Sequence, residues 1–312
     1  MSEYYDAGFD VDAYLASRPR YPACIYDRIL GFHVGRTERL LDLGCGPGQA
    51  SWPLLDHFEN TLGLDPGEKM VQSAQSALKD LERKRAKSYQ DRVQYRVGSA
   101  EKLEGVEDGS VDVVVAGTAA HWFEYEKMWQ EVQRVTRKGS TVAFWTYDIA
   151  YPKEHGSLAK IVSDSAYVDL KPLLNEPGSS IIRSLYRKVP LPADTNAWEE
   201  SSLQTYPVSE DDFVPVLPPQ RGREGNWELL FEDVTTWKEL AAVRRTNSSY
   251  LNWCRLNPGV PQEQDIASIQ VGAMRAAVLK ERKERGIGLE EGLDDEHVRM
   301  MRPMGLLLLR RR

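Results

Sequence analysis

Three glycines at alternate positions, in the run Gly44-Cys45-Gly46-Pro47-Gly48, are the residues whose spacing first suggests chemistry. They directly follow the apolar run Leu40–Leu43, so they stand at a predicted turn from a first strand to a first helix. Glycine has no Cβ, and the backbone there can approach a ligand closely. The dinucleotide-binding pattern GxGxxG would need a glycine at position 49, where this chain has Gln49. The spacing therefore indicates a ligand-binding loop and argues against NAD.

Carboxylates mark the ends of the first two predicted strands. Asp42 stands beside the glycine loop, and Asp65 ends the run Gly63-Leu64-Asp65. An acid at the end of the second strand accepts hydrogen bonds from the ribose hydroxyls of an adenosyl ligand. The methionine part of S-adenosylmethionine carries an ammonium group, to which Asp42 would offer negative charge. These two positions together favour S-adenosylmethionine as the cofactor.

Two further strand ends carry residues that suit the same cofactor. After the third predicted strand, Ala100 is small enough to pass an adenine edge, and Ser99 and Glu101 can bond its amine. After the fourth, Thr118, His121 and Trp122 stand where the methyl donor should end. Four consecutive strand ends with suitable residue types are a more specific signal than any one of them.

Short apolar runs alternating with longer polar stretches predict the elements that position these residues. Runs of this kind are typical of strands buried on both faces of a parallel sheet. The expected strands are Leu40–Leu43, Asn60–Leu64, Val93–Val97, Val111–Ala116 and Thr141–Thr146, and the clearest helices between them are Lys69–Lys87 and Tyr125–Thr136. The predicted fold class is α/β: a Rossmann-like, doubly wound, mostly parallel seven-stranded sheet with helices on both faces.

The expected domain organisation has four parts. Residues 1–38 would form a helical cap over the cofactor, and residues 39–149 the cofactor-binding core. Prolines cluster in residues 150–225, which predicts an insertion that lies over the sheet edge as a substrate lid. Residues 226–312 would complete the sheet and cover the substrate, with strands at Trp227–Val234 and Met304–Arg310 and helices at Thr236–Asn252 and Asp265–Arg285.

Composition excludes several function classes. The net charge of -7 disfavours a nucleic-acid partner or an anionic membrane surface. Three scattered cysteines predict neither a disulfide framework nor a zinc site, and no Asp/His cluster has the spacing of metal ligands. The acidic N-terminal segment does not resemble a secretory signal. We therefore expect a cytoplasmic enzyme without a metal, acting on a small molecule; nothing in the sequence indicates an oligomeric state.

The order of these motifs resembles the class I methyltransferases and, within them, the trans-aconitate methyltransferase family. The resemblance rests on Arg18-Pro19-Arg20-Tyr21-Pro22, the glycine loop, Asp65-Pro66-Gly67-Glu68-Lys69-Met70, Ala120-His121-Trp122-Phe123, and Arg245-Thr246-Asn247-Ser248-Ser249-Tyr250. It implies a segment containing Tyr21 that covers the cofactor. It also implies cofactor contacts by Pro66 and Met70, and a substrate contact by Tyr250. Asn247 stands where the family has an aromatic residue, a departure that falls on the substrate side.

Methyl transfer from a sulfonium is an in-line displacement, so the chemistry depends mainly on holding the reactants in line. A carboxylate acceptor is already ionised at neutral pH and needs cationic anchors, for which Arg20, Arg244 and Arg245 are candidates. A phenol or alcohol acceptor would instead use His121 as general base. Aromatic faces attract a sulfonium, and the candidates for shielding it are Tyr14, Tyr21, Trp122, Trp145 and Tyr147, with Trp145 also expected on the substrate side.

Two further readings belong to other classes of protein. A pericyclase-like protein would keep the cofactor fold without transferring methyl. A nicotinamide oxidoreductase would have to bind its cofactor despite Gln49 and without a recognisable catalytic Tyr-Lys pair.

Overall fold

Five parallel strands form one part of the sheet. The computed structural model describes residues 10–199, 201–209, 213–216, 226, 228–286 and 296–312. The parallel strands lie in the order β3-β2-β1-β4-β5 and are β1 Arg39–Leu43, β2 Asn60–Asp65, β3 Val93–Val97, β4 Val111–Gly117 and β5 Thr136–Tyr147. The strand order reverses between β1 and β4. This switch point is where a doubly wound sheet opens a crevice at the carboxyl ends of its strands.

Alternate residues of the central strands pack into separate apolar cores on the two faces of the sheet. On β4, Val113 and Val115 face one core, whereas Val114 and Ala116 face the other. Helix α2 (Ala23–Phe32) contributes to the first core and α4 (Tyr125–Val135) to the second. Helix α3 (Glu68–Arg85) packs against β3 in a third, smaller core. Burial on both faces explains the nearly continuous apolar runs of these strands.

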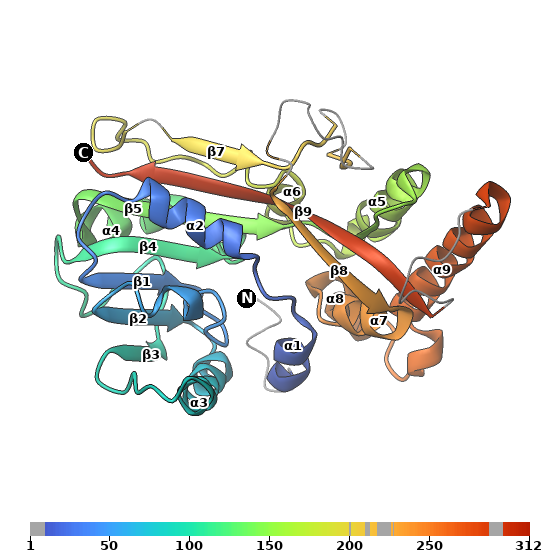
Figure 1. Cartoon of the computed structure of the whole chain (residues 1–312), viewed down its shortest axis with the longest axis horizontal. Helices are drawn as coiled ribbons and strands as arrows, with labels where there is room; N and C mark the ends of the chain where they lie inside the picture. Colours follow the sequence, from blue (N-terminus) through green and yellow to red (C-terminus); the bar gives the residue numbers. More distant parts are fainter. Residues whose placement is uncertain (1–9, 200, 210–212, 217–225, 227, 287–295) are drawn as a thin grey trace.

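Strand β9 (His297–Arg310) extends the sheet in the antiparallel direction (Figure 1). Its carboxyl-terminal half lies between β5 and β7 (Ser202–Thr205), and its amino-terminal half between β6 (Tyr151–Pro152) and β8 (Leu230–Thr236). The predicted fold class is confirmed, with nine strands among the described residues instead of seven. Part of the segment expected to lie over the sheet edge thus belongs to the sheet as β7.

The amino-terminal half of β9 leads toward a helical lobe made of α7, α8 and α9 (Figure 1). The bounds are Trp237–Arg245 for α7, Ser248–Leu256 for α8 and Ile266–Arg285 for α9; the remaining helices are α1 Val11–Ser17, α5 Ala159–Tyr167 and α6 Gly178–Arg183. Short 3-10 turns are η2 Trp52–Leu54, η3 Ala120–Trp122, η4 Gly156–Leu158, η5 Lys171–Leu173 and η6 Gln262–Gln264. In the part of the chain that the structure describes, no helix is both long and apolar enough to cross a membrane.

The single helix expected over Thr236–Asn252 is wrong, because the chain breaks between α7 and α8. Asn247 has extended backbone angles, φ -81° and ψ 145°. The Arg18 Nη2 donates to the Thr246 carbonyl oxygen at 2.9 Å and to Asn247 Oδ1 at 3.3 Å. A side chain distant in sequence therefore takes up a carbonyl that a continuous helix would use.

The first helix expected after the glycine loop is also absent, since only η2 and turns follow there. Arginine side chains from other elements bind the carbonyls of this segment. Arg85 donates to the Trp52 carbonyl at 3.4 Å, and Arg92 to that of Leu55 at 3.1 Å. These bonds replace the helical ones and hold the segment against α3 and β3.

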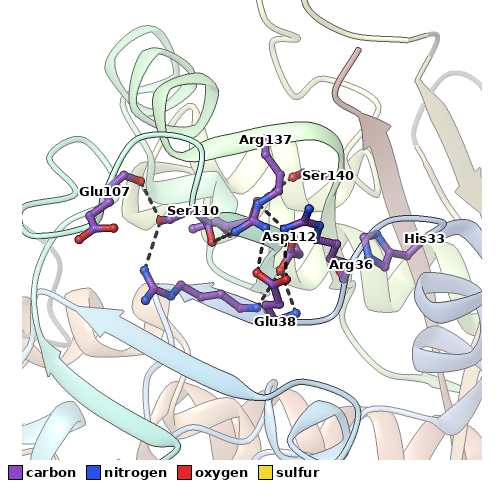
Figure 2. A network of polar contacts seen from close by, with 10 residues as sticks. His33, Arg36, Glu38, Glu107, Ser110, Asp112, Arg137 and Ser140 are labelled. Carbon is purple, nitrogen blue, oxygen red and sulfur yellow. Dashed lines mark hydrogen bonds and ion pairs between the residues drawn. The ribbon is translucent and has the colours of Figure 1, made fainter.

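A polar network ties together the starts of β1, β4 and β5 at the amino-terminal edge of the sheet (Figure 2). Asp112 is 1% exposed, and its Oδ2 accepts hydrogen bonds from the backbone N–H groups of Glu38 (2.9 Å) and Arg39 (2.8 Å). Arg137 forms ion pairs with Asp112 (3.3 Å) and Glu38 (3.0 Å) and donates to the Ser110 carbonyl (2.8 Å). Two backbone N–H groups and a guanidinium thus approach this buried carboxylate, and the network connects the starts of the three strands.

Candidate functional site

The glycine loop closes over the carboxyl end of β1 in a conformation that suits glycine. Gly44, Gly46 and Gly48 have φ values of +65°, +50° and +89°, a region that other residues seldom adopt. A Cβ on Gly44 would stand 2.6 Å from that of Ala119, after β4. At Gly46 no atom lies within 4 Å of the corresponding position. The loop is therefore tight on one side and open on the other.

Asp65 shapes this loop from the end of β2. Its Oδ2 accepts a hydrogen bond from Gly46 N at 2.9 Å, and its Oδ1 one from Gly67 N at 2.8 Å. Burial raises the pKa of Asp65 to about 6, although the two hydrogen bonds oppose the shift. Each carboxylate oxygen retains acceptor capacity beyond its one backbone bond. Asp65 can thus hold the loop and also accept hydrogen bonds from a ligand.

Asp42 lies in β1 beneath the loop and is fully buried. Neither of its carboxylate oxygens has a hydrogen-bond partner. Burial raises the pKa of Asp42 to about 8; the nearby Ser51 hydroxyl opposes this shift, and the charge of Asp65 adds to it. The Ser51 hydroxyl itself bonds to the Gly48 carbonyl oxygen at 3.1 Å. Asp42 is therefore mostly protonated at neutral pH, and it would carry a negative charge beneath the loop only once it is ionised.

A cavity of about 280 Å³ opens at the carboxyl ends of the parallel strands. Most of the residues predicted to bind the cofactor line it: Tyr21, Gly44, Gly46, Asp65, Pro66, Met70, Ser99, Ala100, Glu101, Thr118 and Trp122. Asp42 and Gly48 do not; a Cβ on Gly48 would face Tyr95 and Trp52 instead. Thr118 has a φ of +53° and its Oγ1 accepts a hydrogen bond from the Tyr21 hydroxyl at 3.1 Å. This bond joins the segment after α1 to the end of β4.

The lining on this side fits S-adenosylmethionine. The open face of Gly46 gives the backbone room against a ligand, and Asp65 lines the cavity at the end of β2, the position from which an acid can accept hydrogen bonds from ribose hydroxyls. Ala100 is a small, buried residue, and the neighbouring Glu101 accepts hydrogen bonds from Ser99 Oγ (2.5 Å) and Glu124 N (2.9 Å). The cofactor supplies an electrophilic methyl group on a sulfonium; the chain supplies the cradle and the carboxylates. Among the described residues no group of acidic, histidine or cysteine side chains could hold a metal.

On the opposite side the cavity reaches the helical lobe. Arg18, Arg244 and Arg302 line it, as does Tyr250, whose hydroxyl donates to Asp265 Oδ2 at 2.9 Å. Three residues predicted on the substrate side do not line it. Arg20 is exposed, Arg245 forms an ion pair with Asp265 at 2.7 Å, and Trp145 lies in the core against Tyr21 and Tyr26.

His121 lies in η3 and faces the cavity, with an exposed fraction of only 7%. Its ring centroid is 4.9 Å from that of Trp122, and its Nδ1 is buried without a hydrogen-bond partner. Burial, and then the charge of Arg18, lower the pKa of His121 to about 3. The imidazole is therefore neutral at physiological pH and a weak base.

Sequence reasoning did not assign a role to four lining residues, Arg18, Asp148, Tyr167 and Gln270. A signal existed for Arg18, since Tyr14 and Arg18 are four residues apart and such pairs share a helix face. The Arg18 guanidinium indeed lies 4.7 Å from the Tyr14 ring centre. Asp148 accepts hydrogen bonds from the hydroxyls of Tyr167 and Tyr151, a cluster that no local pattern announces.

Comparison with known proteins gives a consistent result. Residues 41–144 match the family described as "Methyltransferase domain". The chain is 24% identical to "Probable S-adenosylmethionine-dependent methyltransferase CRG1" of Saccharomyces cerevisiae over 88% of this chain and 90% of that one. An uncharacterized methyltransferase-like protein of Schizosaccharomyces pombe is 32% identical over 41% of this chain and 46% of its own.

A solved structure shares the fold. It is a proposed type II methyltransferase from Anaeromyxobacter dehalogenans, with a TM-score of 0.60, 24% identity, and coverage of 93% of this chain and 97% of that one. The domain match and the yeast relative show an S-adenosylmethionine-dependent methyltransferase, and the solved structure shares its fold, with the cavity at the switch point of the sheet.

Proposed function

We propose that this enzyme transfers methyl to a carboxylate oxygen of a small acid, of the trans-aconitate type, and forms a methyl ester. The observation that carries the proposal is Arg244. Its side chain lines the cavity and donates to Gln270 Oε1 at 2.8 Å, and no carboxylate among the described residues pairs with it. Burial lowers the pKa of Arg244 to about 10, so the group stays protonated at neutral pH. Arg244 is half-buried, and a cation that is partly removed from water without a carboxylate partner is costly unless a ligand supplies one.

The state of His121 supports the same acceptor class. A general base works best when its pKa lies near the working pH, whereas that of His121 is lowered to about 3. A carboxylate with a pKa of about 4 is already ionised and needs no base. A phenol or alcohol would have to lose its proton to this weak base. We therefore favour ester formation over methylation of a hydroxyl.

The cavity also suits an acceptor with an apolar portion. Beyond the arginines it is lined by apolar side chains of the lobe and the segment before it: Leu170, Leu174, Ile182, Leu240, Val243 and Ile266. The two arginines lie at different parts of the cavity wall. Arg18 is close enough to His121 for its charge to act on the imidazole, whereas Arg244 donates to Gln270 on α9. An acid that reaches both arginines would be held at two points, which is the orientation that an in-line transfer needs.

The direct test is to incubate the purified enzyme with labelled S-adenosylmethionine and a panel of acids that begins with trans-aconitate. Each acid is paired with its primary amide, and methyl esters are detected by mass spectrometry and by their lability in base. Arg244→Met should raise the KM of an accepted acid roughly 100-fold, as expected for loss of a buried charge partner. The KM for the cofactor should stay unchanged.

Arg245→Met is the matched control, since Arg245 is the neighbouring arginine and pairs with Asp265 instead of facing the cavity. It should lower stability and leave the preference for acid over amide unchanged. Methylation of phenols or alcohols and of no acid in the panel would overturn the proposal.

A further inference from the structure

The neutral side-chain amide of Gln270, on α9, accepts a hydrogen bond from the guanidinium of Arg244. Its Oε1 accepts from Arg244 Nη1 at 2.8 Å, and its Nε2 donates to the Ser165 carbonyl oxygen of α5 at 2.7 Å. These two contacts fix the amide orientation, because a reversed amide would place its NH₂ group against the guanidinium and its oxygen against a carbonyl. The side chain therefore links α5, α7 and α9 at the cavity wall.

The next arginine along α7 shows the opposite arrangement. Arg245 Nε pairs with Asp265 Oδ2 at 2.7 Å, and its Nη2 donates to Ser268 Oγ at 2.7 Å. Burial lowers the pKa of both arginines, but the ion pair with Asp265 outweighs it and leaves the pKa of Arg245 raised, whereas that of Arg244 stays lowered. Of two consecutive arginines, one is neutralised within the protein and the other keeps its charge.

Among the described residues, Asp148 is the one acid that lines the lobe side of the cavity, and its carboxylate binds groups other than Arg244. Asp148 accepts hydrogen bonds from the Tyr167 hydroxyl, the Tyr151 hydroxyl at 3.3 Å and Ile149 N at 2.7 Å. Both tyrosines also act electrostatically on Arg244. Asp148 therefore forms no ion pair with that guanidinium.

We propose that Gln270 is the specificity-determining residue for acceptor charge. Its neutral amide orients the Arg244 guanidinium and leaves the positive charge for the acceptor. A glutamate of nearly the same size would keep the acceptor oxygen but neutralise the cation, and the cavity would lose its preference for anions. This inference rests on the proposed function, since it assumes that Arg244 meets an acidic acceptor.

The test compares Gln270→Glu with Gln270→Leu. Each is assayed by calorimetric titration with S-adenosylmethionine and then for KM and kcat with the acid and primary-amide pairs described above. Gln270→Glu should raise the KM of the acid 30-fold or more, roughly the order of a lost charge contact, with little change for the amide. Gln270→Leu keeps the arginine charge, so it should raise the KM of the acid and the KM of the amide by the same factor, about threefold.

A pH series separates charge from structure. Lowering the pH protonates the introduced carboxyl, so the ratio of the Gln270→Glu KM to the wild-type KM should fall toward that of Gln270→Leu. Unchanged cofactor affinity in both variants serves as the check on folding. If the wild type prefers acids and Gln270→Glu keeps that preference, the inference about Gln270 fails while the proposed function stands. If the wild type accepts no acid, both fail.

Discussion

The two ends of the parallel sheet each bury an aspartate, and the two are treated in opposite ways. At the amino-terminal edge, Asp112 accepts two backbone hydrogen bonds and pairs with Arg137 (Figure 2). At the carboxyl-terminal edge, Asp42 has no hydrogen-bond partner, and burial raises its pKa to about 8. Buried charges normally have partners, because an unpaired one is expensive.

The difference indicates where the chain stores free energy for a ligand. Partners within the protein stabilise the fold at the Asp112 end, which holds three strand starts together. At the other end Asp42 is buried and Arg244 half-buried, each without an oppositely charged partner among the described residues; Arg244 lines the cavity, and Asp42 lies beneath the glycine loop. Groups with perturbed ionisation cluster at functional sites for this reason.

Alanine substitutions at Asp112, at one end of the sheet, and at Asp65, at the other, should separate stability from cofactor binding most strongly. Asp112→Ala leaves the N–H groups of Glu38 and Arg39 without their acceptor, so we expect the free energy of unfolding to fall by about 3 kcal/mol. The affinity for S-adenosylmethionine should be unchanged. Chemical denaturation and calorimetric titration measure the two quantities.

Asp65→Ala should do the reverse. It removes the bonds to Gly46 N and Gly67 N and the ribose contacts that we predict for Asp65, so the cofactor affinity should fall about 10- to 100-fold. The free energy of unfolding should change by no more than about 1 kcal/mol, since relief of a buried charge offsets the lost hydrogen bonds. If a folded Asp65→Ala variant bound S-adenosylmethionine with wild-type affinity, Asp65 would not belong to the cofactor site.

Glycine offers the next comparison between the two ends. Gly44→Ala would force a Cβ to within 2.6 Å of Ala119 at a φ of +65°. The loop must then move, and we expect the affinity for S-adenosylmethionine to fall roughly 100-fold, or about 2.7 kcal/mol. Titration of the purified variant measures this loss.

Gly139→Ala is the matched control, in β5 near its start. Gly139 has a φ of +81°, and nothing lies within 4 Å of its would-be Cβ. This substitution should cost about 1–2 kcal/mol of stability from backbone strain and leave the cofactor affinity intact. Equal loss of affinity in both variants would mean that the effect of Gly44→Ala is not specific to the contact with Ala119.

Local patterns predicted the elements whose causes are local. Strand Val93–Val97 is found as expected, and the helix from Asp265 to Arg285 begins after its capping aspartate. The break before α8 depends on Arg18, more than 200 residues away in sequence. The pairing of β7 with β9 likewise joins segments about 100 residues apart. No window of neighbouring residues contains such information.

The same limit applies to the site. Motifs at strand ends predicted residues that line one side of the cavity, because each motif is contiguous and the sheet brings the strand ends together. On the substrate side the sequence offers two neighbouring arginines, and helix geometry alone does not tell which faces the cavity. Arg244 does so and Arg245 pairs with Asp265, an outcome decided by α9. Gln270 carries no motif at all.

The smallest of the expected effects on cofactor affinity is a pH dependence caused by Asp42. Its pKa is raised to about 8, so the folded protein keeps a proton that the unfolded chain releases near pH 4. The free energy of unfolding should therefore decrease as pH rises from about 4 to about 8. A cationic ligand beside the loop favours the carboxylate and releases that proton. Affinity for S-adenosylmethionine should then increase about three- to tenfold between pH 6.5 and 8 and level off above.

Calorimetric titrations in two buffers of different ionisation enthalpy would detect the released proton directly. Asp42→Asn should abolish the rise in affinity above pH 7, leaving only the contribution of Asp65, whose pKa of about 6 places its own effect lower. The same substitution should flatten the fall in stability toward pH 8. If wild-type affinity is constant from pH 6.5 to 8, Asp42 does not sense the charge in the cavity. The burial of Asp42 would then lower stability without contributing to cofactor binding. The comparison between the two ends of the sheet would depend on Asp65 and Arg244 alone.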